Sequence, residues 1–248
     1  MRIGKGQMIS NTAIVKSSSI GRNVEIREYA VIREGVEIGN DVVIHPHVVI
    51  EPGVTIGART EIFPGTYIGK ETKGAGALAR TPEFERRVII GAECSIGPHS
   101  VIFYDVEIGE NTLLGNGASI REKCRIGSRC VIASYVTVNY NTVIGDRTKI
   151  MDMTHITGNC RIGNDVFVSV SVGTTNDNSM DRLPYDPSRI HGPIIDDGAA
   201  IAAGATLIAN VRVGKGAIVG AGAVVTRDIP EKVLAMGVPA RIVRDLRE

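Results

Sequence analysis

The sequence predicts an all-β protein built as a parallel β-solenoid. Its 248 residues include 32 Ile and 28 Val but only 7 Leu, together with 29 Gly and no Trp. Ile and Val are stiff at the first side-chain torsion and suit pleated strands, whereas Leu is normally among the commonest residues of a globular domain. The other observation is a period of six residues, which runs through most of the chain.

An aliphatic residue at a fixed phase carries the period. It recurs without a failure over residues 14–68, 90–168 and 195–225, which together contain 30 such positions. A helix needs apolar spacings of three and four residues, and a sandwich has strands of varying length joined by hairpins. Neither explains one invariant period, so the repeats predict a solenoid.

One large and one small inward residue per repeat fit a triangular coil. A small or β-branched residue stands four positions after the aliphatic one, as at Val24, Thr60 and Ala118. Gly often follows the aliphatic residue, as at Gly21 and Gly39, and we expect it to supply the backbone conformations of sharp corners. Three repeats make one coil, so the chain should form about ten coils with a length of about 48 Å.

Two segments interrupt the six-residue period. Residues 70–89 (insert one) and 174–194 (insert two) lack the period, and residues 226–248 close the chain as a cap. Long loops on a rigid scaffold usually carry function. We therefore expect one β-helix domain over residues 1–248 with its function near the inserts, and a short terminal helix after residues 237–241.

Charge and composition exclude several classes of function. The formal net charge is +1, so no electrostatic footprint for nucleic acid or an anionic membrane is present. Apolar runs extend over a few residues only, and no apolar signal region follows the N-terminal Met1, so we expect a cytoplasmic protein.

The cysteines fall at the small inward position of the repeat. Pairs that are 36 residues apart lie two coils apart, about 9.6 Å, whereas a disulfide needs Cα atoms within about 7 Å. We therefore expect four buried packing thiols and a reducing compartment. They are Cys94, Cys124, Cys130 and Cys160.

The motif [Ile/Val/Leu]-Gly-x-x-[small]-x, repeated from residue 8 to about 243, resembles the hexapeptide repeat of left-handed β-helix acyltransferases. The resemblance implies a left-handed coil, acyl transfer, and a homotrimer with active sites between neighbouring chains. The γ-class carbonic anhydrases share this fold, but their metal motif needs two His five residues apart. No two of the five His here have that spacing, so we expect no metal.

Residues 151–159 resemble the segment with paired His in the UDP-N-acetylglucosamine O-acyltransferases. His155 matches the first His, and the general base of that family falls at Gly158. A hydroxyl nucleophile benefits from a base, whereas a free amine is already a good nucleophile. The missing base therefore favours N-acylation.

Residues 173–177 resemble the Gly-x-x-x-Thr-Asn-Asp segment of nucleotide-sugar N-acyltransferases, particularly those that act on 3-amino sugars. The resemblance implies a catalytic set of His155, Asn176 and Asp177, in which Asn176 binds the sugar or the thioester region and Asp177 orients the substrate or accepts a proton from the amine. Residues 18 apart should stack on adjacent coils, which places His155 beneath Gly173 at the root of insert two.

Insert one holds three arginines, Arg80, Arg86 and Arg87. Arginine forks suit phosphate oxygens, so these residues are candidates for binding a nucleotide diphosphate.

Residues 213–243 resemble the end of CoA-dependent hexapeptide acyltransferases, with Gly-x-Gly-x-Val-Val-Thr-x-Asp-Ile-Pro and Gly-x-Pro-Ala-Arg signatures. Small residues would let a pantetheine arm lie against the coils, and cationic ones would meet the CoA phosphates. The implied donor site comprises Ala202, Ala203, Lys215, Gly220, Ala221 and Arg241.

The sequence therefore predicts an N-acyltransferase that uses acetyl-CoA to acetylate a dTDP- or UDP-linked amino sugar for surface polysaccharide biosynthesis. Two alternatives stay open. One is a sugar O-acyltransferase that uses acyl carrier protein, since insert one resembles the corresponding loop of those enzymes. The other is a non-catalytic β-solenoid scaffold.

Overall fold

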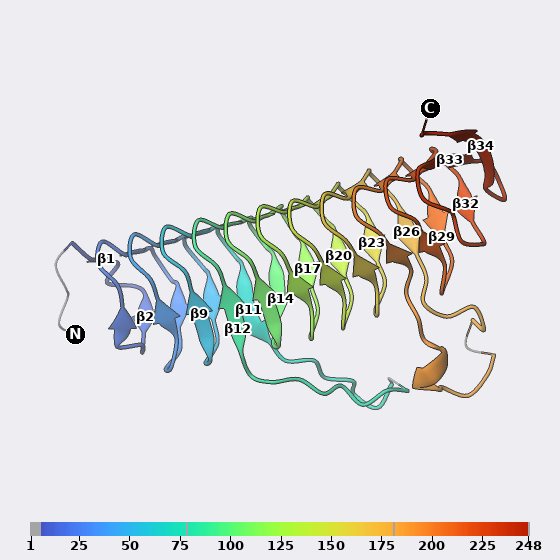
Figure 1. Ribbon diagram of the computed structural model, residues 1–248. Coiled ribbons are helices and arrows are strands. Elements are labelled where there is room, and N and C mark those ends of the chain that lie inside the picture. The colour runs from blue at the N-terminus through green and yellow to red at the C-terminus, as the bar shows by residue number, and fades with distance from the viewer. Residues whose placement is uncertain (1–5, 78, 181, 248) are drawn as a thin grey trace.

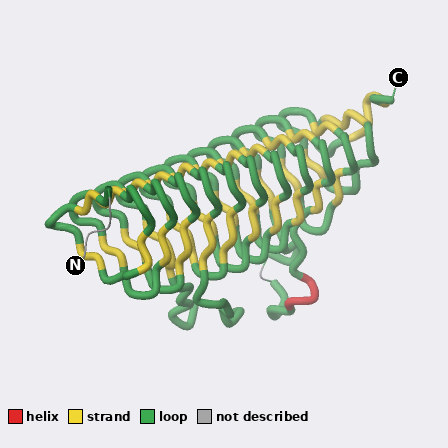
Figure 2. The backbone as a smooth tube through the Cα atoms, turned by 60° about the vertical axis from the view of Figure 1, so that its left-hand side comes forward, coloured by secondary structure: helices red, strands yellow, loops and turns green. Residues whose placement is uncertain are grey.

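The chain winds as a left-handed parallel β-helix with three flat sheets (Figure 1). The computed structural model describes residues 6–77, 79–180 and 182–247; the predicted domain also takes in residues 1–5, 78, 181 and 248, which lie outside the described residues. Consecutive strands pass from sheet A to sheet B to sheet C and back to sheet A, so the coil has a triangular cross-section (Figure 2).

Sheet A has 13 strands. In spatial order they are β1 (Met8–Ile9), β4 (Glu25–Ile26), β7 (Val43–Ile44), β10 (Glu61–Ile62), β13 (Ser95–Ile96), β16 (Leu113–Leu114), β19 (Val131–Ile132), β22 (Lys149–Ile150), β25 (Phe167–Val168), β28 (Ala200–Ile201), β31 (Ile218–Val219), β33 (Val233–Met236) and β34 (Arg241–Asp245).

Sheet B has 11 strands. They are β2 (Ile14–Val15), β5 (Val31–Ile32), β8 (Val49–Ile50), β11 (Tyr67–Lys70), β14 (Val101–Phe103), β17 (Ser119–Ile120), β20 (Thr137–Val138), β23 (His155–Ile156), β26 (Gly173–Thr174), β29 (Thr206–Leu207) and β32 (Val224–Val225).

Sheet C has 10 strands. They are β3 (Ser19–Ile20), β6 (Glu37–Ile38), β9 (Val54–Ile56), β12 (Val88–Ile90), β15 (Val106–Ile108), β18 (Arg125–Ile126), β21 (Val143–Ile144), β24 (Arg161–Ile162), β27 (Ile194–Ile195) and β30 (Arg212–Val213). The described helical structure is one 3-10 turn, η1 (Pro187–Arg189), in insert two.

The core confirms the pattern of one large and one small inward residue. From Ile26 onward the aliphatic phase residues of the strands are buried, and so are the small residues four positions later. Polar side chains at the small position bond to a carbonyl on the next coil, as Thr112 Oγ1 does to Gly127 O at 2.9 Å. Buried polar groups are satisfied in this way at no cost to the packing.

The four cysteines occupy the same small position and are buried, free thiols. Cys130 Sγ lies 3.1 Å from Gly145 O, as a threonine hydroxyl would. Burial raises the pKa of Cys124 and of Cys160 to about 12. The interpretation of the cysteines as packing residues is confirmed.

The glycines that follow the aliphatic residues serve a different purpose from the one expected. A Cβ on Gly57 would lie 2.4 Å from the backbone of Gly91 and Ala92 on the next coil, so glycine is needed for close approach of the coils. The left-handed backbone conformation falls two residues later, on non-glycine residues such as Asn23 (φ 56°) and Asp41 (φ 58°).

Two expectations about the ends of the helix need correction. The coil has more strands than the 30 repeats predicted, because β1 precedes the counted repeats, β26 continues the period at Thr174 where insert two was expected to begin, and β33 follows the last repeat. The predicted terminal helix is wrong: β34 runs antiparallel to β33 and forms a hairpin with it. This hairpin covers the edge strand β31, which would otherwise expose unpaired backbone groups.

Both inserts leave the same corner of the triangle, between sheets B and C. Insert one connects β11 to β12, and insert two connects β26 to β27. Insert one runs along the coils toward insert two (Figure 1). The two interruptions of the period therefore meet on one side of the helix.

Candidate active site

A column of stacked residues forms the floor between the two inserts. Adjacent coils pair in a register of 18 residues, as Thr137 does with His155. At the corner between sheets B and C the residues in register are Tyr104, Glu122, Tyr140, Gly158 and Asn176, which we call the corner column.

His155 lies on the outer face of sheet B, directly before this corner. It pairs with Gly173 on β26, which confirms the predicted stacking. His155 Nδ1 is 2.6 Å from the hydroxyl of Thr137, while Nε2 has no partner among the described residues. Desolvation by burial lowers the pKa of His155, so the imidazole is neutral at neutral pH.

Gly173 leaves open space beside this imidazole. A Cβ built on Gly173 would meet no atom within 4 Å. Since Gly173 is the neighbour of His155 in the ladder, the missing side chain keeps the outer face of sheet B clear on the strand next to His155.

The position expected for a general base is filled by a neighbouring aromatic ring. A Cβ on Gly158 would come within 2.6 Å of Tyr140 Cζ, so a larger residue at 158 would collide with the ring. The Tyr140 hydroxyl accepts a hydrogen bond from Asn176 Nδ2 at 3.2 Å, and the same amide donates to Gly158 O at 3.3 Å. The sequence could have indicated Tyr140, because it stands 18 residues before Gly158.

Asp177 shapes the root of insert two. Its Oδ1 accepts from the backbone N–H of Ser179 at 2.6 Å, and its Oδ2 accepts from the Ser179 hydroxyl at 2.8 Å. The carbonyl of Asn176 accepts from the backbone N–H of His191 at 3.0 Å and ties the two ends of the insert together.

Each of the three arginines of insert one faces a carboxylate. Arg86 pairs with Glu71 and Arg87 with Glu107, both at 2.5 Å. Arg80 pairs with Glu122 of the corner column. The guanidinium groups predicted to bind a diphosphate are therefore all paired with carboxylates of the protein in this structure.

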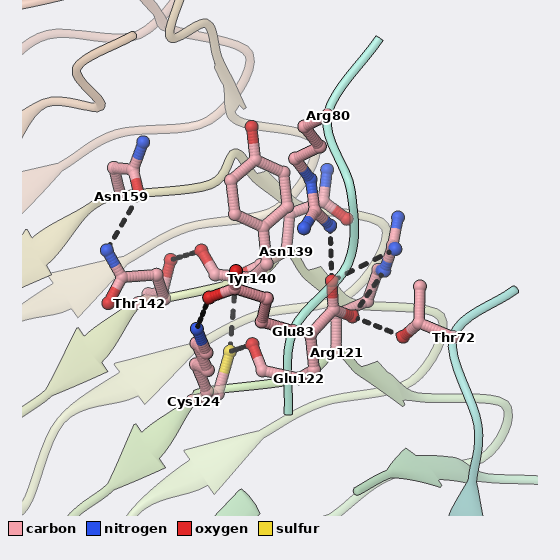
Figure 3. A network of polar contacts seen from close by, with 12 residues as sticks. Thr72, Arg80, Glu83, Arg121, Glu122, Cys124, Asn139, Tyr140, Thr142 and Asn159 are labelled. Carbon is pink, nitrogen blue, oxygen red and sulfur yellow. Dashed lines mark hydrogen bonds and ion pairs between the residues drawn. The ribbon is translucent and has the colours of Figure 1, made fainter. Parts of the chain in front are cut away.

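Glu122 is the centre of a buried polar network (Figure 3). Its side chain is 1% exposed and accepts hydrogen bonds from Arg80, from Thr72 Oγ1 at 2.7 Å and from Arg121 Nε at 3.1 Å. Burial acts to raise the pKa of Glu122, but the hydrogen bonds from Arg80 and Thr72, with the charge of Arg121, outweigh it and lower that pKa. Sequence reasoning missed Glu122, because a carboxylate between Arg121 and Lys123 is typical of a solvated surface.

A cavity of about 620 Å³ opens between the inserts beside this network. Its walls carry amides, phenols and one ammonium group, which suit a ligand with many hydroxyl groups. They include Arg80 from insert one, Lys123, Tyr140, Asn141 and Asn159 from the coils, and Tyr185 from insert two.

The predicted donor residues fall in three places. Ala202 and Ala203 stack on Gly220 and Ala221 at the corner between sheets A and B, where the Gly222 N–H donates to Ala203 O at 2.9 Å. Gly220 is buried because Met236 covers it: a Cβ there would lie 2.6 Å from Met236 Cγ.

The two predicted donor cations lie in different places. Lys215 lies at the corner between sheets C and A and lines a hollow of about 410 Å³. Arg241 begins β34, pairs with Met236, and donates from its guanidinium to Ala240 O at 2.8 Å. The structure therefore brings together the small residues of the donor set, places Arg241 opposite the residue that covers Gly220, and puts Lys215 at another corner.

The described residues contain no group of three or more His, Cys, Asp and Glu placed to hold a metal ion. Nor does any described helix have the length and apolar character needed to cross a membrane.

Two family matches cover separate parts of the chain. Residues 17–52 and 35–70 match the bacterial transferase hexapeptide (six repeats) family. Residues 84–180 match the GMPPB C-terminal domain.

Two curated relatives match short segments. The bifunctional protein GlmU of Rubrobacter xylanophilus is 44% identical over 61 residues, which is 25% of this chain and 13% of that protein. The 2,3,4,5-tetrahydropyridine-2,6-dicarboxylate N-acetyltransferase of Staphylococcus aureus is 40% identical over 63 residues, 25% of this chain and 26% of that protein. The match thus spans about a quarter or less of these relatives.

Solved structures align over more of the chain. The UDP-N-acetylglucosamine acyltransferase of Campylobacter jejuni covers 88% of this chain and 73% of its own at 20% identity, with a TM-score of 0.49. The Arabidopsis UDP-N-acetylglucosamine acyltransferase covers 97% and 73% at 19% identity, also with a TM-score of 0.49. The six-residue period of the coils shows a left-handed parallel β-helix, and residues 17–70 of it are similar to the bacterial transferase hexapeptide family.

Proposed function

We propose that the chain is an acyltransferase that moves an acetyl group from acetyl-CoA to the amine of a dTDP- or UDP-linked amino sugar. One observation carries the proposal: His155 has no partner for Nε2 among the described residues and pairs with Gly173, which leaves open space on the next strand at the root of insert two. The transferase hexapeptide match and the relative named as an N-acetyltransferase support acyl transfer to nitrogen.

The chemistry needs few groups. The amine attacks the thioester carbonyl, the C–N bond forms, and the C–S bond breaks to release the CoA thiolate. His155 Nε2 accepts the proton that the amine loses, and this proton passes on to the thiolate. Asn176 uses its Nδ2 for Tyr140 and Gly158, so its Oδ1 remains to receive an N–H of the amine.

The acceptor sugar lies in the cavity between the inserts. Amides such as those of Asn141 and Asn159 bond to hydroxyl groups, and the rings of Tyr140 and Tyr185 offer apolar faces to a sugar. Asn141 Nδ2 already donates to Asn159 Oδ1 at 2.8 Å, which fixes how both amides are turned.

The donor approaches from the opposite edge of sheet B. His155 on β23 lies on sheet B between the corner column and the corner between sheets A and B, and the stack of Ala202, Ala203 and Ala221 begins on the latter corner two coils further along. A pantetheine arm that follows this corner toward β23 would bring its thioester to the imidazole. A homotrimer, as the family resemblance implies, would bring a neighbouring chain to complete this side.

The test is an acyl-transfer assay with two donors. Acetyl-CoA and acetyl-acyl carrier protein are each offered with a panel of dTDP- and UDP-linked amino sugars and with their hydroxyl analogues, and products are identified by mass spectrometry. Amide formation with acetyl-CoA is the expected result. Ester formation only, or transfer only from the carrier protein, would overturn the proposal.

A further inference from the structure

Insert one contacts the coils at several places, and the contact with Glu122 is buried. The side chains of Arg80 and Thr72 both come from insert one and both donate to this carboxylate, which is 1% exposed. Arg80 itself is only 17% exposed. Breaking a buried pair by removing one partner is costly, because the other charge stays buried without compensation.

The other polar contacts of insert one with the coils are more exposed. Arg87 pairs with Glu107, and Glu83 lies 3.7 Å from Lys123. Exposed ion pairs of this kind contribute about 0–1 kcal/mol, so the buried Glu122 network is the strongest polar contact of the insert. An apolar contact adds to it, since the ring of Phe84 stacks on Tyr104 with centroids 6.0 Å apart.

The network continues from the insert to the candidate catalytic amide. The Arg80 guanidinium lies over the Tyr140 ring at 3.8 Å from its centroid. The ring also packs against Gly158, which fixes its position in the corner column. Its hydroxyl receives the hydrogen bond from Asn176. The order of contacts is therefore Glu122, Arg80, Tyr140 and Asn176 (Figure 3 draws the first three).

We propose that Glu122 is the positioning residue of the acceptor site and that insert one is a strap whose docked position it sets. Through Arg80 it holds the wall formed by residues 79–83 of the cavity, and through Tyr140 it holds the amide of Asn176. Without the carboxylate the strap lifts, the cavity loses this wall, and acceptor binding weakens while the donor corner, on the far edge of sheet B, is unaffected. The proposal rests on the proposed function only for the identity of the acceptor.

The test compares Glu122→Gln with the matched control Glu71→Gln. Both changes neutralise a glutamate that pairs with an arginine of insert one, but the Glu71–Arg86 pair is exposed, with side chains 49% and 71% exposed. Hydrogen exchange is measured over residues 70–89, and KM for each substrate and kcat are measured separately.

For Glu122→Gln we expect protection of residues 70–89 to be lost and KM for the acceptor to rise about tenfold, a change of about 1.4 kcal/mol. KM for the donor should stay within about twofold, whereas kcat should fall together with the rise in acceptor KM, because the amide of Asn176 is held through Tyr140. Glu71→Gln should resemble wild type throughout. Unchanged exchange in Glu122→Gln, or a fall in kcat with both KM values unaltered, would overturn the proposal.

If Glu122→Gln does not fold, the variant Arg80→Lys tests the same proposal. Lysine keeps the charge beside Glu122 but lacks the planar group that stacks on Tyr140. The expected result is a protected strap with a raised acceptor KM, and an unaltered acceptor KM would contradict the relay through Tyr140. If no donor and acceptor react at all, the proposed function fails, and the exchange measurement still decides whether Glu122 docks the strap.

Discussion

The ring of Tyr140 occupies the space into which a side chain at Gly158 would project, with its Cζ 2.6 Å from the Cβ position. A histidine base at 158 and this tyrosine exclude one another. We therefore expect Gly158→Ala to displace the ring and lower kcat/KM at least tenfold, because the hydrogen bond between Tyr140 and Asn176 is lost. Steady-state kinetics measure the effect.

The double variant Tyr140→Ala/Gly158→Ala supplies the control for this steric explanation. The three atoms nearest to the added methyl group all belong to the Tyr140 ring, so without the ring the double variant should be no slower than Tyr140→Ala alone. Additive losses would mean that Gly158 matters for a reason other than room for Tyr140.

The two side chains at the root of insert two should matter for chemistry more than for folding. His155→Ala removes the proton acceptor, and Asn176→Ala removes the amide that faces the amine, so each should lose at least about tenfold in kcat/KM. Size-exclusion chromatography should give the wild-type elution volume for both, since neither residue contributes to the core. Activity near wild type in both variants would refute the site.

The pH dependence of activity should show the lowered pKa of His155. Burial favours the neutral imidazole, so His155 keeps its ability to accept a proton down to pH values below its ordinary pKa of 6.5. The ratio of wild-type to His155→Ala kcat/KM cancels the titration of the amine substrate itself. The midpoint of the fall in this ratio should lie below pH 6.5; a midpoint at or above pH 6.5 would contradict a lowered pKa.

The thiols should be inert in the folded chain. The pKa of Cys124 and of Cys160 is about 12, and burial also raises the pKa of Cys94 and Cys130, so the reactive thiolate is scarce. Ellman's reagent should therefore label none of the four rapidly at pH 8 and all four in guanidinium chloride. Fast labelling of any thiol in the native state would mean that a coil opens locally.

The six-residue period could be predicted from the sequence because every coil needs the same large and small inward side chains, so the same residue types recur at the same positions. The membership of the corner column is implicit in the period through its spacing of 18 residues, but the roles of its members are not. Tyr140 and Glu122 owe their roles to insert one, which folds back over several coils and buries a carboxylate that looks like a surface residue. The terminal hairpin escaped prediction for a similar reason, since residues 241–245 pair with a strand that only the end of the solenoid leaves uncovered.

Two glycine substitutions should separate the scaffold from the site. In Gly57→Ala the new Cβ would lie 2.4 Å from backbone atoms of the next coil, which cannot move without shifting the whole turn. Overpacking of this kind costs about 1–3 kcal/mol and should lower Tm by about 5 °C.

In Gly173→Ala the new Cβ meets nothing within 4 Å, so Tm should stay at the wild-type value. The methyl group would instead project from the strand next to His155, into the open space that the proposed reaction needs, and should lower kcat. Calorimetry and kinetics on the two variants should therefore give opposite patterns; a Gly173→Ala variant with wild-type kcat would mean that the acyl group does not pass over this part of sheet B.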